Sequence, residues 1–351
     1  MLRLSHTISC LLLCFASVAC ADFNRPLNAS AAVDYGFQSE AAGGDPGDHE
    51  ASTGAAGETA MREDLPSPIL SAATSQSYDP ERWTVVGQMR EHRVQGRESL
   101  LEIARDHGLG YREVTRINPE LDPFLPGDGA PVMLPTARVL PQTPYEHGMV
   151  LNLPEKRLYY FYTLTNDRLV ISFPVGIGTA DRGTPLGDFT ITRKLTDPSW
   201  TVPPSVREQR PHLPAIIPPG PNNPMGAYAL QLSGGSYFIH GTNRPWSIGR
   251  RATLGCARLY PEDIPVLFRM AAIGTPMKII HQPVKIGRQD EQIFLEIHHD
   301  RYDGKNWRDY WQEAEQMLSK KGWLNQVESG KVAEVARQGR GIPVPIGRLA
   351  K

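Results

Sequence analysis

The chain has 351 residues and a formal net charge of −1, and 40% of its residues are hydrophobic and 21% charged. This composition is typical of a globular protein with room for two modest domains and some flexible segments. The balanced charge does not predict a broad basic face, so we expect no nucleic-acid partner and no binding to anionic membrane surfaces.

The N-terminus has the pattern of an export signal. An apolar run over residues 8–19 follows Arg3 and is too short to cross a bilayer comfortably. We favour cleavage after Ala21, which makes residues 1–21 a signal peptide; acylation at Cys20, as in a lipoprotein, is the alternative. Both interpretations predict an exported protein of the periplasm or cell envelope. We expect no integral membrane span later in the chain.

Cysteine usage leaves a single thiol in the mature chain. Three of the 4 cysteines lie in or beside the signal segment, and the remaining one is Cys256. A lone thiol cannot form an internal disulfide, and it is vulnerable in an oxidising compartment. We therefore interpret Cys256 as a candidate nucleophile, with a buried structural cysteine as the alternative.

Residues 22–83 predict a disordered linker, because a segment rich in Ala, Gly, Ser, Asp and Glu buries too little apolar surface to offset chain entropy. The next unit, residues 84–140, predicts a small βααβ domain with strands near residues 92–94 and 132–135. It resembles a LysM domain through V-x-x-G-x-x-L-x-x-I-A and I-N-P-E-L-D-P-x-L-P-G. The resemblance implies binding to glycans that contain N-acetylglucosamine, and an inert spacer is the alternative.

Residues 145–282 predict a mainly β domain. Alternating apolar residues predict strands at residues 149–153, 158–162, 169–175, 188–193, 227–232, 237–240 and 276–280. A helix is predicted from Glu262 to about Ile273, and the proline-rich stretch 200–224 predicts a long loop near the site. The extension over residues 283–351 predicts a strand at 293–297, an amphipathic helix at 307–320 and a basic tail.

Two residues of this β domain suit thiol chemistry. His240 ends a predicted strand, and Cys256 lies in a turn shortly before the predicted helix. Gly255 would let that turn aim amide N–H groups at a developing oxyanion. The nearby imidazole and helix N-terminus would favour the reactive thiolate.

The segment over residues 239–259 resembles the signature of YkuD-type L,D-transpeptidases, in which I-H-G-T-N, a Ser-Ile-Gly stretch and G-C-x-R-L occur in this order. Similarity extends to residues 183–191, 218–226 and 260–264, so the resemblance covers about residues 145–282. It implies a catalytic domain of the β-sandwich kind with one or two helices. It also implies an enzyme that cleaves the peptidoglycan stem tetrapeptide before its terminal D-Ala through a thioester, and that carbapenems would target.

The resemblance implies a role for each of several residues. Cys256 is the nucleophile, His240 the general base, the Gly241 carbonyl orients the imidazole, and the Gly255 backbone contributes to the oxyanion hole. The candidate substrate contacts are Arg258, Thr242 and Asn243. Arg258 suits a substrate carboxylate because its guanidinium is planar and forked, and a structural ion pair is the alternative. No metal and no cofactor are expected.

Leu254 departs from the family pattern, which usually has Ser/Thr-His-Gly-Cys. We expect a working enzyme, because His240 and Cys256 are intact. The expected partners are peptidoglycan stem peptides and glycan, and the acyl acceptor is either a second stem peptide or a lysine of a wall-anchored lipoprotein. A thiol hydrolase on the same fold and a catalytically dead peptidoglycan-binding protein are the alternatives.

No motif for another hydrolase chemistry is present: the chain has no G-x-S-x-G, no S-x-x-K and no H-E-x-x-H. The run His298-His299-Asp300 is not expected to hold a metal, because adjacent histidines on a strand point to opposite faces.

Overall fold

The computed structural model describes residues 71–142 and 146–350. The expected signal peptide and most of the expected linker lie outside the described residues. In the described ranges, no helix is long and apolar enough to cross a membrane.

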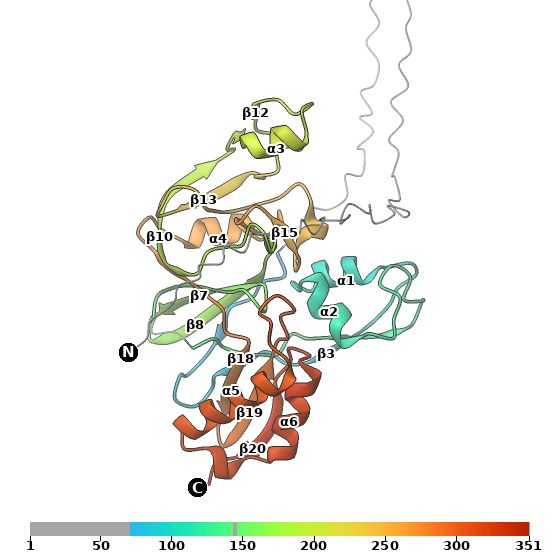
Figure 1. Ribbon diagram of the computed structural model, residues 1–351, viewed down its shortest axis with the longest axis vertical. Helices are drawn as coiled ribbons and strands as arrows, with labels where there is room; N and C mark the ends of the chain where they lie inside the picture. Colours follow the sequence, from blue (N-terminus) through green and yellow to red (C-terminus); the bar gives the residue numbers. More distant parts are fainter. Residues whose placement is uncertain (1–70, 143–145, 351) are drawn as a thin grey trace, which may run out of the picture. The chain divides into compact units, whose positions relative to one another are not determined.

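A nine-stranded sheet organises the predicted catalytic domain, which confirms the mainly β prediction (Figure 1). Its strands, in spatial order, are β1 (Gln76–Ser77), β8 (Asp167–Pro174), β7 (Arg157–Leu164), β6 (Gly148–Asn152), β17 (Pro276–Ile280), β10 (Gly187–Thr196), β13 (Tyr228–Leu232), β14 (Phe238–His240) and β16 (Ala257–Arg258). Neighbouring strands are antiparallel except for two parallel pairs, β6 with β17 and β14 with β16. The parallel pair β14–β16 carries the candidate site.

The core of this domain follows from the apolar alternation of its strands. Leu230 and Ile239 are fully buried in it, and helix α4 (Ile264–Met270) covers β13 through Leu267. Burying each such side chain stabilises the fold by roughly 1.5–3 kcal/mol. The core therefore fixes the strands that position the site.

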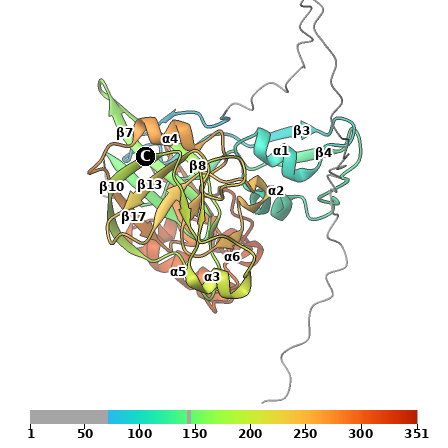
Figure 2. The same ribbon diagram turned by 90° about the horizontal axis from the view of Figure 1, so that it is seen from above.

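The predicted βααβ unit is present as strand β3 (Arg90–Arg93), helices α1 (Leu100–Asp106) and α2 (Tyr111–Ile117), and strand β4 (Pro131–Leu134), as Figure 2 shows. Ser99 and Glu102 form a capping box at the start of α1. The unit has an apolar core of its own, made by Val94, Leu100, Ile103, Ala104, Leu109, Val114, Val132 and Leu134. We call residues 90–134 the βααβ module.

The C-terminal extension contains more regular structure than predicted. The predicted strand and helix are confirmed as β19 (Gln292–Ile297) and α5 (Trp307–Lys320). The basic tail also contains elements that were not predicted, α6 (Ser329–Gln338) and β20 (Val344–Arg348), and β18 (Val284–Gln289) completes the sheet. Figure 1 shows α5 and α6 packed side by side against this sheet. The basic residues of the tail alternate with buried Val332, Val335 and Ile346.

The predicted linker extends too far into the folded part. Residues 76–77 form β1 on the edge of the large sheet, and the ring of Tyr78 lies 5.5 Å from that of Phe161. Strand β2 (Val85–Val86) pairs with β5 (Arg138–Val139) outside the βααβ module. Few apolar residues mark these short strands, and their partners lie far away in the sequence.

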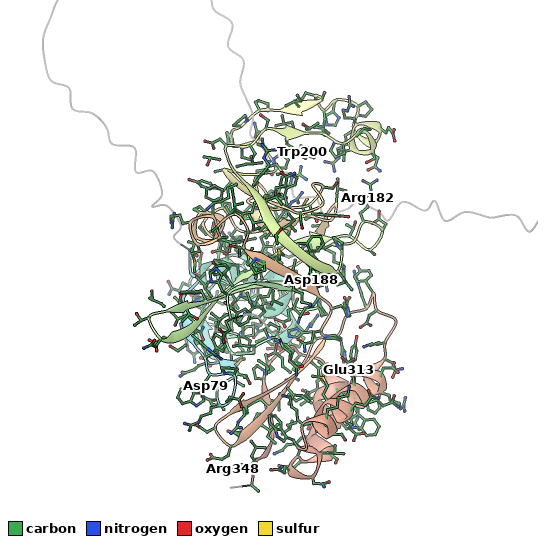
Figure 3. The ribbon with its side chains drawn as sticks, turned by 90° about the vertical axis from the view of Figure 1, so that its left-hand side faces the viewer. Asp79, Arg182, Asp188, Trp200, Glu313 and Arg348 are labelled. Carbon is green, nitrogen blue, oxygen red and sulfur yellow. The ribbon has the colours of Figure 1, made fainter. Side chains whose placement is uncertain are left out.

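The proline-rich stretch is also more regular than a loop. It contains the two-stranded pair β11 (Trp200–Thr201) and β12 (Ile216–Ile217), with helix α3 (Pro204–Gln209) between them. Proline is tolerated at the first position of a helix, where its missing N–H has no partner to lose. Arg182 Nη1 donates to Ser205 Oγ at 3.3 Å, and Figure 3 labels Arg182 and Trp200 in this part.

Candidate active site

The pairing of β14 with β16 positions His240 relative to Cys256. Ile239 pairs with Ala257 and His240 pairs with Arg258, in parallel register. Ile239 and Ala257 are buried in the core. Because side chains alternate between faces, His240 and Arg258 both lie on the opposite face, and Cys256 directly precedes β16. The register thus brings the predicted base beside the strand that follows the predicted nucleophile.

The imidazole of His240 is buried and held through its Nδ1. The distance from Nδ1 to the Gly241 carbonyl oxygen is 2.6 Å, so this nitrogen donates the hydrogen bond. The backbone groups of Met225 and Pro224 also interact with the ring. In the neutral ring this leaves Nε2 as the acceptor, the position that a general base requires. The predicted contact with the Gly241 carbonyl is present.

The segment that ends the proline-rich stretch supports this histidine. Asn223 is 1% exposed, donates from Nδ2 to the Pro198 carbonyl at 2.8 Å and accepts from the Met225 amide at 2.8 Å. A Cβ atom at Gly226 would lie 2.9 Å from the backbone of Gly241, so only glycine allows this approach. Sequence reasoning missed Asn223, although the matching stretch 218–226 contained it.

The turn that carries the thiol is tied down by Thr253. Its Oγ1 donates to the Cys256 carbonyl at 2.7 Å and accepts from the Gly255 amide at 3.1 Å. Gly255 has φ +113°, and a Cβ atom there would lie 2.8 Å from the ring of Tyr237. Glycine is therefore required at this position. Its N–H, which we expected to face an oxyanion, is occupied by Thr253 in this conformation, so the oxyanion role of Gly255 stays a prediction.

Electrostatics keep both partners uncharged near neutral pH. Burial raises the pKa of the Cys256 thiol, an effect partly offset by the Phe238 backbone amide and by Arg258. Burial, followed by the charge of Arg258, lowers the pKa of His240 to about 3. A resting thiolate–imidazolium pair is thus disfavoured, and the thiol proton must leave as the nucleophile attacks.

Arg258 has the surroundings of a ligand-binding cation. Its Nη1 donates to the Ala252 carbonyl at 3.3 Å, and its Nε is buried without a hydrogen-bond partner. Among the described residues it forms no ion pair with a carboxylate. The alternative role of Arg258, a structural ion pair, is therefore not found among the described residues. Burial, followed by the charge of the nearby Arg244 guanidinium, lowers the pKa of Arg258.

The other two predicted substrate contacts, Thr242 and Asn243, already form hydrogen bonds with nearby backbone groups. Thr242 is buried, and its Oγ1 accepts from the Arg244 amide at 2.9 Å. Asn243 donates from Nδ2 to the Asn222 carbonyl at 3.0 Å, and its Oδ1 is buried without a partner. Leu254 is 44% exposed beside the thiol. Asn243 thus keeps a free acceptor, and its substrate role, like that of Thr242, stays a prediction.

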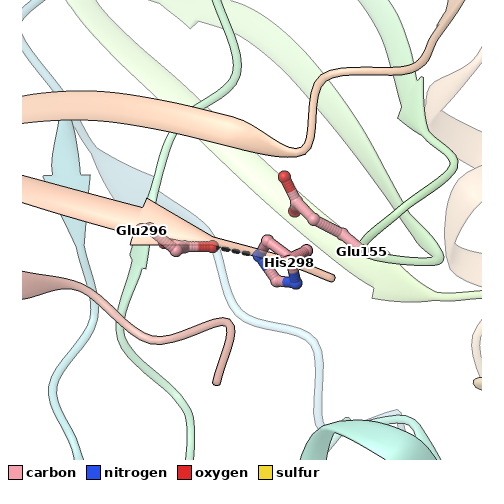
Figure 4. Close-up of side chains that lie close together, drawn as sticks. All are labelled: Glu155, Glu296 and His298. Atoms are coloured by element: carbon pink, nitrogen blue, oxygen red, sulfur yellow. Dashed lines mark hydrogen bonds and ion pairs between the residues drawn. The ribbon is translucent and has the colours of Figure 1, made fainter. Parts of the chain in front are cut away.

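A separate cluster of Glu155, Glu296 and His298 has the composition of a metal site (Figure 4), but a buried lysine contacts both of its carboxylates. His298 Nε2 lies 2.5 Å from Glu296 Oε1, the contact dashed in Figure 4. The ammonium of Lys285, which is fully buried, lies 2.6 Å from Glu155 and 2.8 Å from Glu296. This ammonium supplies the positive charge that a metal ion would bring. His299 instead contacts the Ala336 carbonyl at 2.7 Å.

Several known proteins are similar to this chain. The family model for the YkuD L,D-transpeptidase catalytic domain matches residues 146–286. In Escherichia coli K12, the probable L,D-transpeptidase ErfK/SrfK is 39% identical over 239 residues, which cover 65% of this chain and 75% of that protein. The probable L,D-transpeptidase YcfS of the same strain is 37% identical over 236 residues, which cover 64% and 73%. The solved L,D-transpeptidase 3 of Mycobacterium tuberculosis is 15% identical, with a TM-score of 0.28 over 44% of this chain and 76% of that one.

The domain over residues 146–286 is therefore a catalytic domain of the kind that the family model describes. Because the identity to ErfK/SrfK is 39% and extends over 75% of that relative, the chain belongs to the L,D-transpeptidase family.

Proposed function

We propose that the protein is a peptidoglycan L,D-transpeptidase that works through a Cys256 thioester. The observation that supports this most is the pairing of β14 with β16, which brings the uncharged imidazole of His240 beside the strand that directly follows the uncharged Cys256 thiol, with His240 Nδ1 held by the Gly241 carbonyl. A neutral pair of this kind suits general-base activation of the thiol during attack.

In the first step, Sγ of Cys256 attacks the carbonyl carbon of the third residue of a stem tetrapeptide. His240 Nε2 takes the thiol proton and then gives it to the nitrogen of the terminal D-Ala. The C–N bond breaks, D-Ala leaves with a neutral amine, and a thioester remains. Backbone N–H groups of the 253–256 turn are the candidate donors to the oxyanion, provided that Gly255 exchanges its bond to Thr253.

In the second step, an acceptor amine attacks the carbonyl carbon of the thioester, so that a C–N bond forms and the C–S bond to Cys256 breaks. His240 Nε2 removes a proton from the amine nitrogen, and the Cys256 thiol is regenerated by that proton. Arg258 is the candidate to bind a substrate carboxylate, because it pairs with His240 across the two strands and forms no ion pair among the described residues. Asn243 Oδ1 is available to accept from a substrate amide. A stem-peptide amine and a lipoprotein lysine are the candidate acceptors.

The reaction is tested by incubating the full chain with purified disaccharide tetrapeptide and identifying the products by mass spectrometry. A dimer that has lost one D-Ala supports the transpeptidase. A tripeptide without any dimer would replace it with the thiol hydrolase. No product from the wild type, with peptidoglycan binding retained, would indicate a catalytically dead binder. Cys256→Ala is the control, because this small change leaves the strands of the site in place.

We further propose that the βααβ module binds peptidoglycan glycan in the manner of a LysM domain, and that the protein is exported to the cell envelope. The module has its own core, and its two strands pair with each other, so residues 90–134 form a testable unit. That unit should co-sediment with insoluble peptidoglycan, with a dissociation constant on the order of micromolar to millimolar. Failure to co-sediment while folded by circular dichroism would make it a spacer.

A further inference from the structure

A cavity of about 570 Å³ lies apart from Cys256 and is lined mainly by cations. Of its 15 lining residues, 8 are Arg or Lys and the only acidic one is Asp300. The lining comes from helix α2 of the βααβ module, from the catalytic domain and from the C-terminal extension. A chain with a net charge of −1 has no general excess of basic residues, so this concentration is local.

Most of these cations have no carboxylate partner. Arg251 pairs with Asp300 at 2.7 Å, and Lys305 pairs with Glu313 at 2.6 Å. The six others, among the residues described by the structure, lie within 4.0 Å of no carboxylate: Arg112, Arg116, Lys156, Arg250, Arg301 and Arg337. Like charges held together without counter-charges repel one another, so an anion entering the cavity would relieve that repulsion.

The inner part of the cavity is built around buried cations. Lys156 is 8% exposed, and its Nζ has the Pro154 carbonyl at 3.4 Å as a distant neighbour. Its backbone has φ +58°, which is unusual for a residue with a side chain. Burial, followed by the charge of Arg116, lowers the pKa of Lys156 to about 8. The fold therefore holds this ammonium where its own charge is disfavoured.

The guanidinium groups that line the cavity are held in place, but some of their N–H donors have no hydrogen-bond partner. The Arg250 guanidinium lies 3.8 Å from the centre of the Tyr111 ring, and its Nε is buried without a hydrogen-bond partner. The Nε of Arg251 is buried and unpartnered as well. Asn306 and Trp307 of the lining form the N-terminus of the 14-residue helix α5, an end that favours negative charge. Planar stacking fixes these donors in directions suited to oxyanion groups.

We propose that this cavity binds a compact ligand that carries two linked phosphate groups. Two phosphates bring more negative charge into a small volume than carboxylates do, and they match a lining with six unpaired cations. The volume suits a small molecule or a head group and excludes a nucleic-acid duplex. The same chemistry occurs in a soluble diphosphate and in a phosphorylated head group at a membrane. The site is independent of the proposed transpeptidase function, because neither Cys256 nor His240 lines the cavity.

Isothermal titration of the full chain with inorganic pyrophosphate, at fixed ionic strength, tests the proposal. We expect one pyrophosphate per chain, with citrate binding at least about tenfold more weakly, a difference of about 1.4 kcal/mol. Arg337→Gln and Arg116→Gln should each weaken pyrophosphate binding by about tenfold or more. Arg337 is exposed on α6, so its variant tests the site without a risk to folding. Arg269→Gln is the matched control, since it removes the same charge from an exposed residue outside the cavity.

A second experiment distinguishes a soluble diphosphate from a phosphorylated head group at a membrane. Vesicles of phosphatidylcholine that contain a lipid with a diphosphate head group are compared with plain phosphatidylcholine vesicles in co-sedimentation. Binding that pyrophosphate displaces supports a membrane head group, and pyrophosphate binding without vesicle binding supports a soluble ligand. The proposal is overturned if pyrophosphate gives no heat, if citrate binds equally well, or if Arg337→Gln and Arg116→Gln bind like Arg269→Gln.

Discussion

At the scale of single residues, Cys256 and His240 form a pair that is uncharged at rest. Burial raises the pKa of the thiol and lowers the pKa of the imidazole to about 3, so each shift opposes proton transfer in the resting state. The position before Gly255, usually a histidine in the family, holds Leu254, which supplies no charge to stabilise a thiolate. The reactivity of the site should therefore depend strongly on pH.

We predict that iodoacetamide labels Cys256 with a midpoint above the ordinary thiol pKa of about 8.5. The reason is that the thiolate forms only above the raised pKa. Leu254→His should move the midpoint down and speed labelling near neutral pH, since a partly protonated imidazole favours the thiolate. Leu254 is 44% exposed, so the change should cost little packing. Leu254→Gln is the uncharged control, and labelling curves that coincide for all three proteins would show that this position does not tune the thiol.

Arg258 should act mainly on substrate binding. Arg258→Gln should lower kcat/KM by roughly 10- to 100-fold, because a charged hydrogen bond to a carboxylate contributes about 1.5–3 kcal/mol. Arg258→Lys keeps the charge and should recover part of the loss. Steady-state kinetics with disaccharide tetrapeptide measure both variants. Equal kinetics for Arg258→Gln and the wild type would leave Arg258 with no role in substrate binding.

His240 and Cys256 show which features of the site the sequence alone can predict. The motif identified His240 and Cys256 because their types and order are specific. It could not reveal that Thr253 occupies the Gly255 amide or that Asn223 supports the histidine. Both contacts depend on the path of the backbone through turns, which no periodicity records.

At the scale of elements, a buried lysine links the sheet of the C-terminal extension to the catalytic domain. Lys285 of β18 contacts Glu155 and Glu296 and donates to the Val139 carbonyl. The carboxylate of Glu296 also accepts from the Val139 amide at 2.5 Å. Burial alone would raise the pKa of Glu296, but Lys285 and His298 outweigh it and hold that pKa below its ordinary value.

We predict that Lys285→Met lowers the free energy of unfolding at neutral pH by roughly 3–5 kcal/mol, because two carboxylates would stay buried without their counter-charge. In the wild type the Glu296 pKa is depressed by folding, so its stabilisation is full above about pH 4.3 and is lost as the pH falls. In the variant, acid protonates Glu296, so the deficit should shrink.

Urea denaturation at neutral and acidic pH measures this. The exposed pair of Lys331 and Glu328 gives a control, since Lys331→Met should change stability by no more than about 1 kcal/mol. A deficit for Lys285→Met as small as that of the control would contradict the assignment.

The elements themselves were predicted unevenly, for physical reasons. Long strands such as β7 and helix α5 follow from alternation or helical periodicity over many residues. Strand β18 was missed because Lys285 and Gly287 interrupt its apolar pattern, although both are buried. Helix α6 was missed because Gly330 and its polar residues conceal a narrow stripe that includes Val332, Val335 and Ala336.

At the scale of the whole molecule, charged side chains connect the βααβ module to the catalytic domain. Arg157, whose side chain is 2% exposed, lies 2.9 Å from Glu113, and Arg105 lies 2.7 Å from Glu262. In the sequence these are ordinary charged residues that predict solvent exposure. Their pairing could not be predicted, because it depends on surfaces that meet only in the folded chain. The proposed glycan-binding and acyl-transfer units are thus connected by partly buried ion pairs.

The central claim is that Cys256 forms the covalent intermediate, and intact-protein mass spectrometry after incubation with a carbapenem tests it most directly. The β-lactam carbonyl resembles the scissile amide and should acylate the thiol. We predict one adduct with the mass of one carbapenem on the wild type, located on Cys256 by peptide mapping, and none on Cys256→Ala. An adduct of equal yield on Cys256→Ala, or a wild type that stays unmodified at alkaline pH while folded, would contradict the account.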